Sequence, residues 1–227
     1  MPERSMPERT VDTWVASAIC SVSPDARIWD PTQAMRGRNW DRAFLPLEAG
    51  RVFIFEDKGT TAVTRTRKRP LQTHRIEIDA AQLNWYCDEV EPASRIPVYY
   101  VLPRPPWNGG AGSGHVPEQA TCRVTSAAGP FPQWAYVSRC IDLRQGLCDR
   151  RSIDTDQLPL PGGMTLAKFF VDVRDGKAGK WLSPDDEDAP WRLRSPSLKT
   201  AGAEGTCQNL HTGSALAVFV PVGNLTS

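Results

Sequence analysis

The chain has no two cysteines in the CxxC spacing, no apolar run long enough to cross a membrane and no large excess of charge. Structural zinc sites usually draw their ligands from CxxC pairs, so a site of that kind is not expected. Because no apolar signal sequence precedes Thr10, we expect a cytoplasmic protein with mostly reduced cysteines and no membrane partner. Lys and Arg number 27 and Asp and Glu 26, so a surface that attracts nucleic acid must be local.

Composition divides the 227 residues into four parts. Residues 1–9, most of a five-residue tandem duplication, are expected to form a flexible tail. Residues 10–103 carry regular helix and strand patterns and are expected to form the core. Gly and Pro concentrate in residues 104–130, which predicts a long loop. Residues 131–227 are expected to pack on the same domain as a loop-rich C-terminal extension, with a helix over Thr165–Arg174 and a terminal strand over Ala215–Val222.

The patterns within residues 10–103 predict an α/β fold. Apolar residues at three- and four-residue spacing indicate one helix from Thr10 to just before Pro24, and Asp79 can cap another over residues 80–89. The strands have little polar alternation, which is typical of a sheet covered on both faces. We therefore expect a mixed central sheet flanked by helices, with strands over Arg27–Trp29, Trp40–Leu45, Arg51–Gly59 and Pro97–Leu102.

The strand Arg51–Gly59 ends in Glu56, Asp57 and Lys58. Side chains alternate between the two faces of a strand, so Glu56 and Lys58 share one face and Asp57 lies on the other. A carboxylate beside an ammonium at the open end of an apolar strand suits metal-dependent phosphodiester hydrolysis. The simpler interpretation is a strand that reaches the surface and ends in charges, because a three-residue pattern often arises by chance.

Three further polar residues extend this pattern. Asp41 stands fifteen positions before Glu56, and Gln82 and Tyr86 are four apart, so they lie on one face of a helix. The carboxylates of Asp41 and Glu56 are hard oxygen ligands for Mg²⁺ or Mn²⁺, which would neutralise phosphoryl charge and activate water. Lys58 would lie next to that water and offset negative charge in the transition state. Gln82 could orient the lysine, the water or a phosphate.

A basic segment follows Lys58 after a short interval. It contains Arg65, Arg67, Lys68 and Arg69 between small hydroxyl residues. Such a run is usually a solvated loop, but next to the candidate site it could hold a phosphate backbone.

Asp41, the Glu56-Asp57-Lys58 element and the stretch from Gln82 to Tyr86 resemble the PD-(D/E)xK nuclease superfamily, with the QxxxY helix of its RecB-like branch. The resemblance covers roughly residues 10–103 and implies a restriction-endonuclease-like core. It also implies a Mg²⁺-dependent nuclease acting on DNA, with Asp41 and Glu56 as metal ligands. Many members act as dimers, so a homodimer is an expectation as well. The implied catalytic residues are Asp41, Glu56, Lys58 and Gln82, and the implied nucleic-acid contacts are Arg65, Arg67, Lys68, Arg69 and Tyr86.

The chain departs from the family pattern at several positions. Asn39 and Trp40 stand where the family has Pro or Gly before the first acid, and Asp57 replaces an apolar residue. No helix glutamate is evident, and Asp12 is the nearest candidate for that position. Two other interpretations stay open: a catalytically inactive nuclease-fold module that binds nucleic acid or a protein, and an ordinary α/β protein whose charged strand end is a coincidence.

Overall fold

Strand β2 (Gly50–Asp57) lies inside the main sheet and is buried at seven of its eight positions. The computed structural model describes residues 5–29, 49–64, 72–105, 131–148, 150–182 and 214–221. Its main sheet has the strand order β1-β10-β2-β5-β6-β8, with β9 also paired to β2. β2 runs parallel to β5 and antiparallel to β10 and β9, so the predicted mixed sheet is confirmed. The other strands are β1 (Arg27–Trp29), β5 (Val98–Pro103), β6 (Ala135–Arg139), β8 (Met164–Thr165), β9 (Lys180–Leu182) and β10 (Ser214–Pro221).

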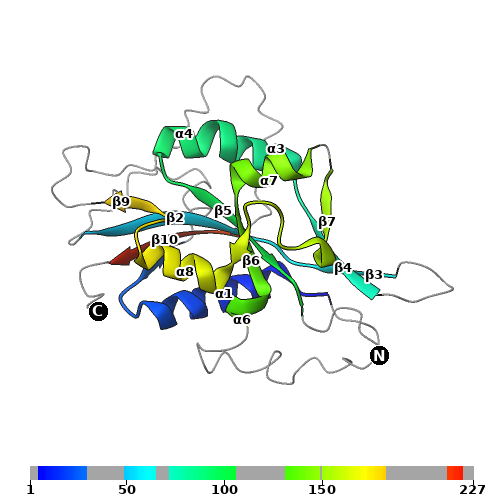
Figure 1. Cartoon of the computed structure of the whole chain (residues 1–227), viewed down its shortest axis with the longest axis horizontal. Coiled ribbons are helices and arrows are strands. Elements are labelled where there is room, and N and C mark those ends of the chain that lie inside the picture. Colours follow the sequence, from blue (N-terminus) through cyan, green and yellow to red (C-terminus); the bar gives the residue numbers. More distant parts are fainter. Residues whose placement is uncertain are drawn as a thin grey trace.

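Helices cover both faces of this sheet (Figure 1). On one face, Val52 and Ile54 of β2 pack in a core with residues of α3 (Ala80–Trp85) and α7 (Cys140–Leu147). On the other face, Phe53 and Phe55 pack with residues of α1 (Glu8–Val22), α6 (Phe131–Trp134) and α8 (Leu166–Arg174). The near-continuous apolar sequence of β2 follows from burial on both sides.

The N-terminal segment differs from the expected tail. Met6 is buried at 3% exposure, and its backbone exchanges hydrogen bonds of 3.1 and 2.8 Å with Thr60 just after β2. Pro7 has the extended conformation that precedes a helix, and α1 begins at Glu8 rather than near Thr10. Residues 5–9 are thus part of the fold because an apolar side chain and two backbone hydrogen bonds hold them to the end of β2.

The helical segment after Asp79 begins as predicted. The Asp79 side chain accepts hydrogen bonds from the backbone N–H groups of Ala81 and Gln82. α3 then continues without a break into a π-helical turn, η1 (Tyr86–Val90), and a short α4 (Glu91–Ser94). Turns of this wide kind are frequently found at functional sites.

The C-terminal part contributes more to the sheet than the sequence indicated. Beyond covering the core, it supplies β6, β8, β9 and β10, and β10 lies between β1 and β2. The terminal strand and the helix α8 are confirmed, and the Thr165 side chain caps α8 by accepting from the Lys168 backbone N–H.

A second, three-stranded sheet extends from one side of the molecule (Figure 1). It contains β3 (Thr61–Thr64), β4 (Gln72–Glu77) and β7 (Ser152–Asp154), which is followed by a 3₁₀ turn, η2 (Thr155–Gln157). Asp41, the strand expected over residues 40–45 and the basic residues Arg65, Arg67, Lys68 and Arg69 lie outside the described residues. Among the helices that are described, none combines the length and the apolar character needed to span a membrane.

Candidate functional site

The C-terminal end of β2 brings four of the predicted site residues together. The Lys58 Nζ atom lies 2.5 Å from Glu56 Oε1 and donates a 2.9 Å hydrogen bond to Gln82 Oε1. Tyr86 OH donates a 2.7 Å hydrogen bond to Glu56 Oε2. Residues from a strand end and from a helix 24 to 30 positions further along the chain thus form one connected polar cluster.

Local periodicity explains how these side chains meet. Glu56 and Lys58 are two apart across the end of β2, so both point towards α3 and η1. The Tyr86 N–H donates to the Gln82 carbonyl, so the spacing between these two residues is α-helical and the wide turn starts only at Tyr86. Both side chains therefore lie on one face of the helix, as the sequence predicted, and both reach the Glu56–Lys58 pair at the end of β2.

Burial makes the electrostatics of this cluster strong. Glu56 is 0% exposed, Lys58 7% and Tyr86 5%. Burial alone would lower the pKa of Lys58, but Glu56 and Glu8 outweigh it and raise that pKa, so the ammonium is retained. Burial and the negative charge of Glu56 raise the pKa of Tyr86 well above its ordinary value, so the phenol stays protonated and donates its hydrogen.

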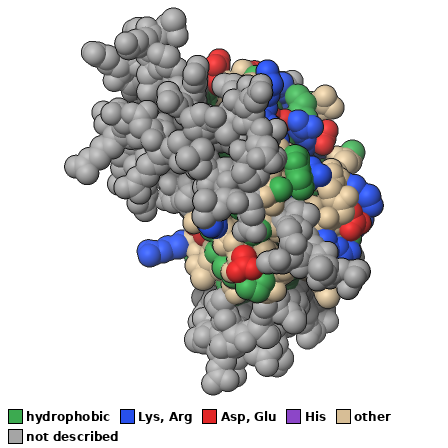
Figure 2. Space-filling view, turned by 90° about the vertical axis from the view of Figure 1, so that its left-hand side faces the viewer, with side chains coloured by type: hydrophobic (Ala, Val, Ile, Leu, Met, Phe, Trp, Pro, Cys, Tyr) green, Lys and Arg blue, Asp and Glu red, His purple; other side chains and the backbone are tan. Residues whose placement is uncertain are grey.

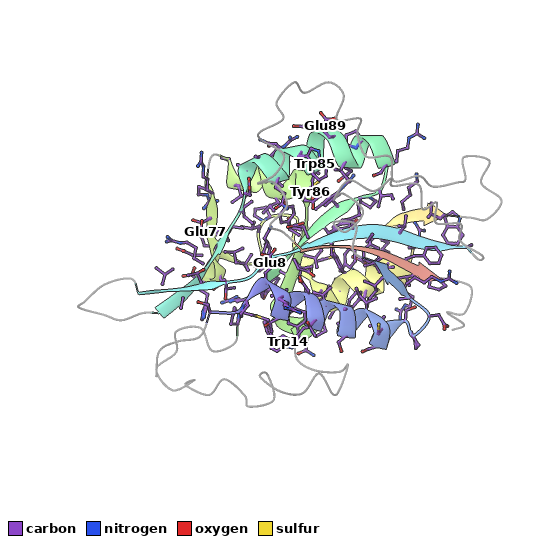
Figure 3. The ribbon with its side chains drawn as sticks, turned by 180° about the vertical axis from the view of Figure 1, so that it is seen from behind. Glu8, Trp14, Glu77, Trp85, Tyr86 and Glu89 are labelled. Atoms are coloured by element: carbon purple, nitrogen blue, oxygen red, sulfur yellow. The ribbon has the colours of Figure 1, made fainter. Side chains whose placement is uncertain are left out.

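Glu8 is a residue of the site that the sequence reasoning missed. Its Oε1 atom lies 3.6 Å from Lys58 Nζ, and it projects from the first turn of α1. Figure 3 shows Tyr86 in the helical layer on one face of the sheet and Glu8 at the start of α1 on the other. In the sequence, Glu8 stands four residues before Asp12, so the two lie on the same helical face, and this spacing could have identified Glu8. Glu8 was missed because it fell within the part of the chain expected to be a tail.

Asp57 lies on the face of β2 opposite Glu56, as the alternation predicted. It is 0% exposed and contacts the Asp12 carboxyl group of α1. Burial first, and then the charges of Asp12 and Glu56, raise the pKa of Asp57 well above its ordinary value. The end of β2 therefore carries two different polar clusters, one on each face.

The hydrogen bond from Tyr86 to Glu56 can be tested by removing one oxygen. Tyr86→Phe should lower the free energy of unfolding by about 1.5–3 kcal/mol, because the bond is buried and its acceptor is charged. Tyr100→Phe is the matched control, since the Tyr100 hydroxyl is buried and has no hydrogen-bond partner among the described residues. Urea unfolding should show a clear loss for the first variant and none for the second. Equal effects would mean that the Tyr86 bond contributes nothing.

The cluster has part of what a metal site would require. Within the described ranges, no three His, Cys, Asp or Glu side chains are placed to hold one ion. Glu56 accepts one hydrogen bond on each oxygen, and a carboxylate has about four lone-pair positions, so it can still ligate a cation. Glu56 therefore suits the role of an oxygen ligand for Mg²⁺, while its expected companion Asp41 lies outside the described residues.

Comparison with known proteins adds no assignment: no family model, curated protein or solved structure matches the chain.

Proposed function

We propose that the chain is a metal-dependent nuclease with a restriction-endonuclease-like core, acting on DNA. The observation that carries the proposal is the connected cluster of Glu56, Lys58, Gln82 and Tyr86 at the end of β2. An E-x-K triplet alone is a weak pattern. A Gln and a Tyr from a separate helix, each bonded to one of its charged members, are a more specific arrangement.

Each side chain has a definite part in the proposed reaction. Glu56, with Asp41, would hold a Mg²⁺ or Mn²⁺ ion, which supplies Lewis-acid stabilisation of phosphoryl charge. Lys58 keeps its proton and lies beside Glu56. Its positive charge would stabilise the negative charge that develops on the phosphate during the reaction. Gln82 orients the Lys58 ammonium through its carbonyl oxygen, and Tyr86 fixes the second oxygen of Glu56.

Binding of the substrate would depend on local basic groups. On the side of the molecule seen in Figure 2, Lys and Arg side chains are intermixed with Asp and Glu side chains over the part that the structure describes. The segment with Arg65, Arg67, Lys68 and Arg69 connects β3 to β4, and in the chain it follows the site after the short strand β3. We propose that this segment contacts the phosphate backbone.

Plasmid cleavage tests the proposed activity. Purified protein with Mg²⁺ should nick or cut supercoiled plasmid, and Lys58→Ala or Asp41→Ala should slow this by about 100-fold or more. Arg144→Ala removes an exposed ion pair with Asp88 and should leave the rate unchanged. Equal cleavage by the wild type and both site variants would indicate a contaminating nuclease and reject the proposal.

A second candidate is a catalytically inactive module that binds nucleic acid or a protein. The observation in its favour is that both Glu56 oxygens already accept hydrogen bonds inside the protein and that Glu56 is 0% exposed. Such a module would bind DNA without metal, lose affinity with salt and with removal of the basic segment, and be unaffected by Lys58→Ala.

A further inference from the structure

The Asp57 side chain is a buried carboxylate at the end of β2. It is 0% exposed, and neither of its carboxylate oxygens receives a hydrogen bond from the residues that the structure describes. Its polar neighbour is the Asp12 carboxyl group, which has no proton to give when it is ionised. Glu56, by contrast, accepts from both Lys58 and Tyr86.

The surroundings of Asp57 are strongly negative. Glu56 precedes Asp57 in β2, and the Asp12 carboxyl group of α1 contacts it from the neighbouring helix. The nearby cation, Lys58, lies against Glu56 and Glu8. A buried carboxylate in such a place must take up either a proton or a cation.

We propose that Asp57 and Asp12 together bind a divalent cation of the Mg²⁺ or Mn²⁺ type between β2 and α1. This site would lie on the face of β2 opposite the Glu56 cluster. It would join the first helix to the central strand through one ion.

The chemistry of the two ligands suits such an ion. Mg²⁺ keeps several of its waters and is commonly held by only one or two carboxylates, so a third acidic ligand is not required. Asp12 as a residue is partly buried, and its Oδ1 atom is shielded from solvent. Asp57 is fully buried at the end of the face of β2 that carries Phe53 and Phe55. Packing there holds its two oxygens in a fixed position, as a metal ligand requires.

The inference does not depend on nuclease activity. The proposed catalytic ion would use Glu56 and Asp41, whereas this ion uses a side chain on the other face of the strand. Counting bound metal tests it separately from plasmid cleavage, so either proposal can fail while the other stands.

The experiment is a titration of the full chain with Mn²⁺ after removal of metal with EDTA, with free Mn²⁺ measured by electron paramagnetic resonance. Asp57→Asn and Asp12→Asn should each bind one Mn²⁺ fewer per chain than the wild type, or bind it at least tenfold more weakly. Glu56→Gln and Asp172→Asn should retain that ion, since Asp172 is a buried carboxylate of α8 already paired with Lys168. The thermal midpoint of Glu56→Gln, which lacks a ligand of the proposed catalytic ion, should rise with Mg²⁺, and that of the double variant Glu56→Gln with Asp57→Asn should not.

Two results would overturn the inference. The first is a wild type that binds no Mn²⁺ and shows no thermal response to Mg²⁺. The second is an Asp57→Asn variant that binds Mn²⁺ like the wild type, which would mean that Asp12 and Asp57 share a proton instead. Asp12→Asn removes the other ligand of the same ion, so the test holds even if Asp57→Asn fails to fold.

Discussion

Lys58→Met should lower the free energy of unfolding by about 3–5 kcal/mol, because it leaves the buried Glu56 charge without its cation. Methionine keeps most of the length and apolar volume of the lysine stem, so the effect reports charge rather than a cavity. The Glu56 carboxylate is 0% exposed, and Tyr86 is the one hydrogen-bond donor to it that would remain among the described residues. Urea unfolding at neutral pH measures the loss.

A double variant separates this electrostatic effect from loss of packing. In Lys58→Met with Glu56→Gln, both charges of the pair are removed together, and most of the lost stability should return. A neutral amide can still accept from Tyr86. If the double variant were as unstable as the single one, packing of the lysine stem would be the cause and the buried ion pair would not matter.

The sequence predicted the parts of the site that depend on local periodicity. Strand alternation placed Glu56 and Lys58 together and Asp57 opposite, because the side-chain period of two leaves no other arrangement once β2 is buried on both faces. Helical spacing likewise placed Gln82 beside Tyr86. Asp79 was identified as a helix cap because its residue type and position suffice for that role.

The parts that the sequence did not predict depend on contacts between distant segments. Glu8 lies near Lys58 beside the pairing of Met6 with Thr60, and neither of these contacts can be read from the pattern of residues 1–9. The same holds for β10, whose apolar run indicated a strand but not its place between β1 and β2. Short strands such as β8 and β9 carry too few residues for an alternation to be recognised.

Gly59 is the position where the N-terminal segment and the site depend on each other most closely. A Cβ atom at Gly59 would lie 2.7 Å from both the Glu8 backbone nitrogen and the Met6 carbonyl oxygen. Backbone atoms cannot rotate away as a side chain can, so Gly59→Val should cost about 3 kcal/mol, at the upper end of the usual range for overpacking. The N-terminal segment would be pushed away from β2, and Glu8 would lose its position near Lys58.

Gly146→Val is the matched control for this substitution, because a Cβ atom at Gly146 in α7 would meet no heavy atom within 4 Å. Its free energy of unfolding should stay within about 0.5 kcal/mol of the wild type. Urea unfolding of both variants, with limited proteolysis near Arg9 to detect release of the N-terminal segment, makes the comparison. Wild-type stability and protection in Gly59→Val would show that residues 5–9 do not rest against the end of β2, and Glu8 would then have no part in the site.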